Sequence, residues 1–156
     1  MADLAGRVAL VIGASRGVGK GVALGLGEAQ ATVYITGRTV QEGAGVDGLP
    51  GTIYQTADEV ERLGGRVIPV QCDHRDDAQV AALFRRIISD HGRLDLLVNN
   101  VWGGYEHLLL DGQYVDSLPF WEQPIERWDL MFAAGVRAHY VASVLATKSM
   151  TEQHRA

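Results

Sequence analysis

The chain has 156 residues, of which 47% are apolar and 21% charged, a composition typical of one globular domain with a sizeable core. Its net charge of −5 disfavours partners such as nucleic acid or an anionic membrane surface. The single cysteine, Cys72, excludes an intrachain disulfide and a cysteine metal cluster, and it fits a reducing, cytoplasmic location. We expect neither a secretory signal nor a membrane span, because the first apolar run, Val8–Ile12, is short and no uninterrupted apolar run reaches spanning length.

A strand, a glycine-rich turn and a helix open the chain. The apolar run Val8–Ile12 predicts a buried strand, and the spacing of Val18, Val22 and Leu26 predicts a helix after it. The turn between them has the spacing Gly-x3-Gly-x-Gly, at Gly13, Gly17 and Gly19. Glycines here permit a tight turn and a close approach of the backbone to a pyrophosphate, which the helix N-terminus would also attract.

Other phosphate-binding loops fit this turn less well. A P-loop would need glycine in place of Ala14 and serine or threonine in place of Gly21. The Gly-x-Gly-x2-Gly form fails at Val22. A glycine-rich turn in an α/β protein that binds no nucleotide remains the alternative at this point.

The next elements alternate between strand and helix. Val33–Ile35 is β-branched and aromatic and predicts a second strand, which the glycine-rich loop Gln41–Thr52 follows. Thr56 and Glu59 form a candidate capping box that would start a helix, and the glycines at 64 and 65 would end it. Alternation of this kind predicts parallel strands joined by helices.

Pro69 places the third strand, Val67–Val70, at the edge of the sheet, because proline cannot donate to a strand ladder. An edge position agrees with the strand order 3-2-1-4 of a doubly wound sheet. The apolar period of Asp77–His91 predicts a helix, and Leu94–Val98 predicts the fourth strand.

A long loop is expected over Val101–Gln123, followed by a long helix from Pro124 to near Met150 with Gly135 inside it. Aromatic residues in this loop could shape a substrate pocket or pack in the core: Trp102, Tyr105, Phe120 and Trp121.

Three features together resemble the short-chain dehydrogenase/reductase family: the turn Gly13–Gly19, Asp73 after the third strand, and Asn99-Asn100 after the fourth. The resemblance covers the whole chain but only the first half to two-thirds of a usual family member. It implies a Rossmann-type doubly wound parallel sheet, with residues 1–156 as an incomplete NAD(P)-binding domain that lacks the C-terminal strands of the full fold.

The resemblance also implies a cofactor site. Carried over by position, Gly13, Ser15, Gly17 and Val18 line the pyrophosphate. Asp73 and His74 lie by the adenine, Asn99 ties the fourth strand to the glycine turn, and Asn100 begins the stretch beside the ribose. The complete set of expected cofactor-binding residues is Gly13, Ser15, Arg16, Gly17, Val18, Gly19, Arg38, Asp73, His74, Asn99 and Asn100.

Charge indicates which dinucleotide binds. An NAD site places an acidic residue about twenty residues beyond the glycine motif, where this chain has Arg38 and reaches its first acid only at Glu42. Arg38, with Arg16 closing from the other side, suits a ribose 2′-phosphate, so we expect NADP(H) to be preferred over NAD(H). Otherwise both arginines are solvated loop residues.

The catalytic pair of the family, a tyrosine with a lysine four residues later, does not occur in this chain. Its two lysines follow Arg16 and Val144 at that spacing, and the family asparagine of the long helix falls at Gly135. Ser143 is expected to be a packing residue, and the five histidines form no metal set. We expect no catalytic residue and no metal site.

Three interpretations therefore stay open. The first is the cofactor-binding part of an NADP(H)-dependent carbonyl or alcohol oxidoreductase, whose small substrate would bind only in a full-length form. The second is a non-catalytic nucleotide-binding module, and the third is an inactive remnant. An apolar fourth strand left at the edge, with a long helix that pairs with a second subunit in the family, predicts a homo-oligomer or a poorly stable isolated chain.

Overall fold

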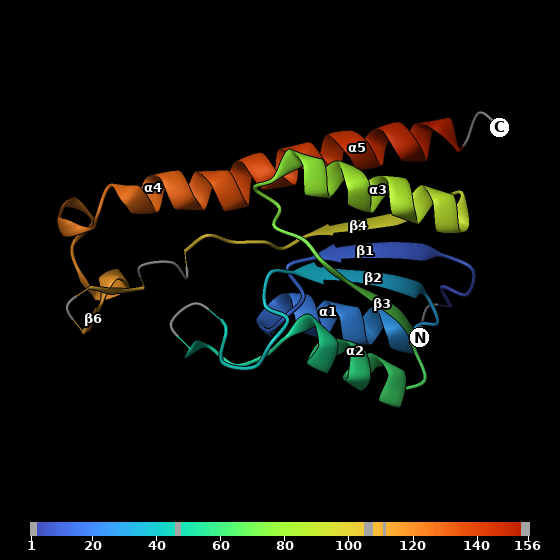
Figure 1. Cartoon of the computed structure of the whole chain (residues 1–156), viewed down its shortest axis with the longest axis horizontal. Helices are drawn as coiled ribbons and strands as arrows, with labels where there is room; N and C mark the ends of the chain where they lie inside the picture. Colours follow the sequence, from blue (N-terminus) through green and yellow to red (C-terminus); the bar gives the residue numbers. More distant parts are fainter. Residues whose placement is uncertain (1–2, 46–47, 105–107, 111, 154–156) are drawn as a thin grey trace.

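The computed structural model describes residues 3–45, 48–104, 108–110 and 112–153. Its centre is a parallel sheet with the order β3-β2-β1-β4 (Figure 1). The strands are β1 (Val8–Ile12), β2 (Thr32–Gly37), β3 (Arg66–Gln71) and β4 (Leu96–Asn99). The expected order is confirmed, and Pro69 lies in the edge strand β3, where a missing N–H donor costs nothing.

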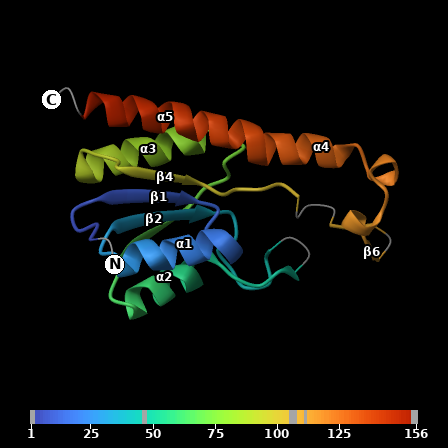
Figure 2. The ribbon, with the colours of Figure 1, turned by 180° about the vertical axis from the view of Figure 1, so that it is seen from behind.

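Helices cover both faces of the sheet, which makes three layers (Figures 1 and 2). On one face lie α1 (Gly17–Glu28) and α2 (Ile53–Arg62), and on the other lie α3 (Asp77–His91) and α5 (Ala138–Glu152). Alternate residues of β1 serve the two faces: Leu10 packs in the core under α3 and α5, and Val11 packs in the core under α1 and α2. Because both faces are covered, the whole strand is apolar and buried.

The long C-terminal helix is continuous but not uniform. It consists of α4 (Glu126–Met131), the π-helical segment η4 (Phe132–Arg137) and α5. Its α4 end projects beyond the sheet, on the side to which the carboxyl ends of the strands point (Figure 1). By length and composition alone, the helix Glu126–Glu152 could cross a membrane, but this is weak evidence, because the core helix of a soluble protein passes the same test.

Three expectations about boundaries were wrong. The long helix begins at Glu126, not at Pro124. Helix α2 begins at Ile53, and its capping box is formed by Thr52 and Gln55, not by the pair at 56 and 59. Thr56 lies inside the helix, where its hydroxyl donates to the Ala14 carbonyl at 2.9 Å. Strand β4 begins at Leu96, so Leu94 precedes it and is fully buried.

The segment expected to be one long loop contains short elements. A two-stranded antiparallel pair joins β5 (Leu109–Leu110) to β6 (Gln113–Tyr114), and two 3-10 turns follow, η2 (Val115–Ser117) and η3 (Phe120–Glu122). These elements lie near the projecting end of α4, away from the sheet (Figure 2).

Candidate functional site

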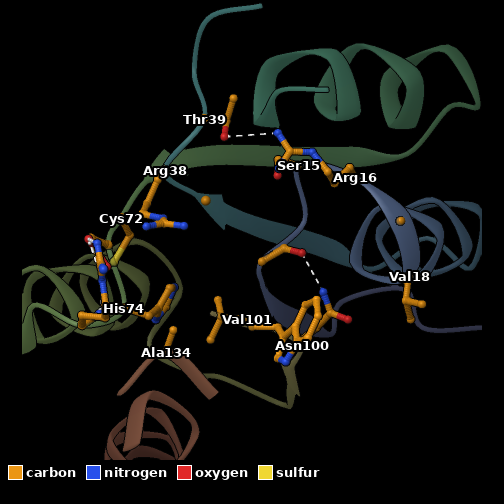
Figure 3. Close-up of a pocket in the computed structure, with 16 residues that line it drawn as sticks. Ser15, Arg16, Val18, Arg38, Thr39, Cys72, His74, Asn100, Val101 and Ala134 are labelled. Carbon is orange, nitrogen blue, oxygen red and sulfur yellow. Dashed lines mark hydrogen bonds and ion pairs between the residues drawn. The ribbon is translucent and has the colours of Figure 1, made fainter. Parts of the chain in front are cut away.

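A cavity of about 260 Å³ lies at the carboxyl ends of the parallel strands (Figure 3). The glycine-rich turn after β1 forms one wall, and the ends of β2 and β3 form another. The segment that follows β4 lines another part of the cavity, and η4 completes the lining. In open parallel sheets, ligands bind in such a crevice, where neighbouring crossover connections leave the sheet in opposite directions.

Nine of the eleven expected site residues line this cavity: Gly13, Ser15, Arg16, Gly17, Val18, Arg38, Asp73, His74 and Asn100. The two exceptions are Gly19 and Asn99. Gly19 lies buried behind the turn, and Asn99 turns toward α5.

Close packing requires glycine at two positions of the turn. A Cβ on Gly13 would lie 2.9 Å from the backbone nitrogen of Val101, and the residue has a φ of +81°. A Cβ on Gly19 would overlap the Gly13 carbonyl and lie 2.5 Å from Nδ2 of Asn100. Gly19 therefore shapes the turn from behind.

The N-terminus of α1 is arranged differently from those of α2 and α3. Thr52 caps α2 and Asp76 caps α3 through side-chain oxygens, whereas Arg16, at the N-cap of α1, makes no side-chain cap hydrogen bond. The first turn of α1 also contains no acidic residue. This end of α1 lines the cavity, so its backbone N–H groups and positive dipole end fit an anionic ligand such as a pyrophosphate.

Asn99, the last residue of β4, and Asn100, which follows it, do not make the contacts expected of them. Asn100, not Asn99, ties this segment to the glycine turn, because its Nδ2 donates to the Gly13 carbonyl at 2.7 Å (Figure 3). Nδ2 of Asn99 donates instead to Oγ of Ser143 at 3.0 Å. Consecutive residues of a strand point to opposite sides, so only one asparagine can reach the turn. Ser143, expected only to pack, has this polar partner.

The two arginines of the site lie differently. Arg38 follows β2 and extends into the cavity, as Figure 3 shows. Arg16 also lines the cavity, but its guanidinium reaches toward Thr39 and the backbone before α2 (Figure 3). The cavity thus has a cation beside the end of β2, where an acidic residue would favour an unphosphorylated ribose.

Asp73 and His74 follow β3 and carry unlike electrostatics. Hydrogen bonds from the Arg75 guanidinium hold the pKa of Asp73 below its usual range, so it is ionised at neutral pH. Burial lowers the pKa of His74 to about 4, so that imidazole is neutral, and its Nε2 lies 2.7 Å from Oγ1 of Thr36. Burial raises the pKa of Cys72 to about 12, so this thiol is unreactive at neutral pH.

Six lining residues were not expected from the sequence: Gly37, Thr39, Cys72, Arg75, Val101 and Ala134. The remaining one, Trp102, was among the aromatic residues that could shape a pocket. Most of them directly flank expected residues at strand ends, so the strand boundaries carried the signal. Ala134 could not be found in this way, because it belongs to η4 and comes more than thirty residues after Trp102, the lining residue that precedes it in the sequence.

The aromatic residues beyond the fourth strand divide into two groups. Trp102 lines the cavity, whereas Phe120 is 82% exposed and Trp121 is 72% exposed, so neither packs in the core. Tyr105 lies outside the described residues.

His139, on α5, places Nε2 2.9 Å from the Val101 carbonyl. Among the described residues, no group of potential ligands could hold a metal ion.

A parallel sheet with a glycine-rich turn and a helix N-terminus open to a cavity at the strand ends defines a Rossmann-type α/β domain. The sequence model of the short chain dehydrogenase family matches residues 7–156. The chain belongs to this family, whose members bind nicotinamide dinucleotides.

Individual relatives agree with this assignment. The chain is 40% identical over 151 residues to dehydrogenase/reductase SDR family member 1 from Mus musculus, covering 96% of this chain and 44% of that protein. A short chain dehydrogenase from Mycobacterium thermoresistibile superposes with a TM-score of 0.77 at 30% identity, over 95% of this chain and 48% of that one. A metagenomic short-chain oxidoreductase in complex with NADP superposes with a TM-score of 0.69 at 28% identity, over 94% of this chain and 57% of that one. The chain thus spans about half the length of these proteins.

Proposed function

We propose that residues 1–156 form the NADP(H)-binding part of an oxidoreductase that acts on carbonyl or alcohol groups. Arg38 carries the proposal, since it brings a cation into the cavity at the position where an NAD site has an acidic residue. The NADP complex of one structural relative supports it. The proposed site consists of the nine expected residues that line the cavity, and Gly19 shapes the glycine turn from behind. Asn99 is bonded to Ser143 and is not part of the proposed site.

The dinucleotide would supply the hydride, and the residues of this chain would bind and orient it. The turn from Gly13 to Val18 and the start of α1 would hold the pyrophosphate, and Asp73 and His74 would lie by the adenine. Asn100 would keep the turn in place through the Gly13 carbonyl.

We propose further that this chain alone transfers no hydride. No tyrosine among its 156 residues is followed by a lysine four positions later, and Tyr140 precedes Lys148 by eight. A chain that binds the dinucleotide without transferring hydride would be a non-catalytic nucleotide-binding module, and this is the second candidate function. Both candidate functions predict NADPH binding by the purified chain without NADPH oxidation in the presence of small aldehydes and ketones. NADPH binding therefore separates them from an inactive remnant, and NADPH oxidation would contradict the proposed absence of hydride transfer.

The cofactor preference is tested by the substitution Arg38→Asp. Removing a cation from a 2′-phosphate costs about tenfold or more in affinity, and the new carboxylate repels the phosphate while it can accept from a ribose hydroxyl. We expect the NADPH dissociation constant to rise and the NADH constant to fall or stay, so that the preference reverses. Fluorescence titration of both cofactors measures this. An unchanged NADPH affinity in this variant would contradict the assignment.

For partners, we propose a second copy of the chain, bound through the long helix. Large side chains at a spacing of four stand exposed along it: Trp128, Phe132, Val136, Tyr140 and Val144. Such a stripe is typical of a helix that packs against another helix.

We propose a cytoplasmic location, supported by the single reduced cysteine, Cys72.

A further inference from the structure

We propose that Arg16 is a positioning residue which anchors the β2–α2 loop (residues 38–52, described except for 46–47) beside the cavity. Its guanidinium donates from Nε to the Pro50 carbonyl at 2.8 Å and from Nη2 to the Gly51 carbonyl at 3.0 Å. Nη2 also lies 3.4 Å from the Leu49 carbonyl. The inference rests on the proposed cofactor site, because this loop carries Arg38.

Arg16 joins both ends of the loop. Besides the three carbonyls at the C-terminal end, Nη2 lies 3.3 Å from Oγ1 of Thr39 at the N-terminal end. Thr39 directly follows Arg38, so the side chain that closes the loop also fixes the residue beside the cavity cation. A charged donor makes these hydrogen bonds stronger than neutral ones.

The backbone at Gly51 is shaped to allow this contact. Gly51 has a φ of +99°, and a Cβ there would lie 2.6 Å from the Ser15 carbonyl and 3.3 Å from Cβ of Arg16. Only glycine fits both the conformation and the space, so the loop end can lie directly on the turn that carries Arg16. Thr52, the next residue, caps α2.

Two further contacts make α2 a fixed support for the loop. The Thr56 hydroxyl donates to the Ala14 carbonyl at 2.9 Å, and Nζ of Lys20 lies 2.7 Å from Oε1 of Glu59. The glycine turn and α2 are therefore held together without Arg16. The loop is tied to α2 by the Ile53 N–H, which donates to the Thr39 carbonyl, and by Nε2 of Gln55, which donates to Oε2 of Glu42. Arg16 adds the contacts that fasten the loop to the glycine turn.

The two arginines consequently have different roles. The hydrogen bonds described for Arg16 occupy Nε and Nη2 with loop acceptors, while Arg38 extends into the cavity (Figure 3). Selection of a 2′-phosphate then depends on Arg38. Arg16 orders the loop on which Arg38 stands and so contributes to the affinity for either dinucleotide.

The test compares Arg16→Ala with the matched control Arg62→Ala in the complete 156-residue chain. Arg62 is an exposed arginine on α2 whose only ion pair described here is a 4.0 Å contact to Glu59. Amide hydrogen exchange without cofactor, read on peptides covering 39–45 and 48–53, reports loop order. Titrations with NADPH and NADH report the role in binding.

In Arg16→Ala we expect at least tenfold faster exchange in these loop peptides, with α2 peptides beyond residue 56 unchanged. Both cofactor dissociation constants should rise by a similar factor of about three to ten, which leaves their ratio within twofold of the original chain. Arg62→Ala should change neither readout. Arg16→Lys should fail to restore loop protection, since an ammonium cannot match the planar fork that spans these acceptors.

Unchanged hydrogen exchange of the loop in Arg16→Ala would overturn the proposal. A selective loss of NADPH affinity with the loop still protected would also overturn it, and would make Arg16 a phosphate ligand. Failure of the proposed function has a different signature. If the original chain bound neither dinucleotide, or both equally, the exchange measurement in the absence of cofactor would still decide whether Arg16 anchors the loop.

Discussion

Asn100 connects the segment after β4 to the glycine-rich turn through one hydrogen bond to the Gly13 carbonyl. We expect Asn100→Ala to lower the free energy of unfolding by about 1–2 kcal/mol, because the partly buried carbonyl loses its partner. NADPH binding should weaken as well, since the turn loses a support. Urea denaturation and a cofactor titration measure the two effects.

The matched control is Asn99→Ala, which removes the hydrogen bond to Ser143. Asn99 is exposed, so water replaces the lost partner and we expect a change within about 0.5 kcal/mol. Equal effects of the two substitutions would contradict the assignment of the turn contact to Asn100.

At the same scale, the residues of the cavity could be predicted largely because they follow strand ends. Parallel strands bring their carboxyl ends to one edge, so Gly13, Arg38 and Asp73 converge although they are far apart in sequence. Which of two adjacent asparagines reaches the turn depends on the phase of β4. The expectation that Asn99 makes this contact came from the family resemblance alone, and the structure gives the contact to Asn100.

At the level of elements, local signals located α3 correctly and α2 only in part. The period of apolar residues, the Asp76 cap and the left-handed Gly92 all agree over Asp77–His91. Two threonines near the start of α2, at positions 52 and 56, each have a glutamine or glutamate three residues later. Tertiary contact decides between them, because the Thr56 hydroxyl bonds to the Ala14 carbonyl.

The π-helical segment η4 has no local signal of this kind. Gly103 lies so close to this helix that a Cβ on it would meet Cβ of Ala134 at 3.0 Å and would overlap the Leu130 carbonyl. This packing joins residues some thirty positions apart, and an interrupted helix ladder cannot be read from the apolar period of one segment.

Asp95 connects the N-terminal ends of β1 and β4, and it makes the stability of this part of the sheet depend on pH. Burial alone would raise its pKa, but hydrogen bonds from Arg93, from the Val8 N–H at 2.9 Å and from Arg7 at 3.0 Å hold it at about 2. A carboxyl with a lowered pKa stabilises the fold above its unfolded-state value, about 3.9, and this contribution disappears as pH falls to about 2.

We expect Asp95→Asn to cost about 1–2 kcal/mol at pH 7, a range that allows for solvent screening of the arginine partners. The difference from the original chain should shrink as pH falls from about 4 to 2. Thermal unfolding over this pH range measures it, with the exposed Asp58→Asn as control. A difference that stays constant with pH would show that Asp95 acts only through neutral hydrogen bonds.

At the scale of the whole molecule, β4 has one neighbour, β1, among the described residues, and the long helix leaves its stripe of large apolar side chains exposed. The sheet order was predictable because Pro69 marks one edge and the glycine turn marks the strand at the switch point. Association of the chain stays a prediction. Exposed apolar area shows where a partner fits, while the structure describes a single chain.

Substitutions on the stripe test the proposed pairing of two copies. Val136 is 59% exposed and Tyr140 is 69% exposed, one helical turn apart on the same side. We expect the original chain to sediment as a dimer or larger species and the double variant Val136→Lys with Tyr140→Lys to raise its dissociation constant by about tenfold or more, since charges would be buried between helices. Glu61→Lys, exposed on α2 at the other face of the sheet, should leave the distribution unchanged. Sharp monomeric sedimentation of the original chain at micromolar concentration would contradict the proposed dimer, and the stripe would then require a different partner.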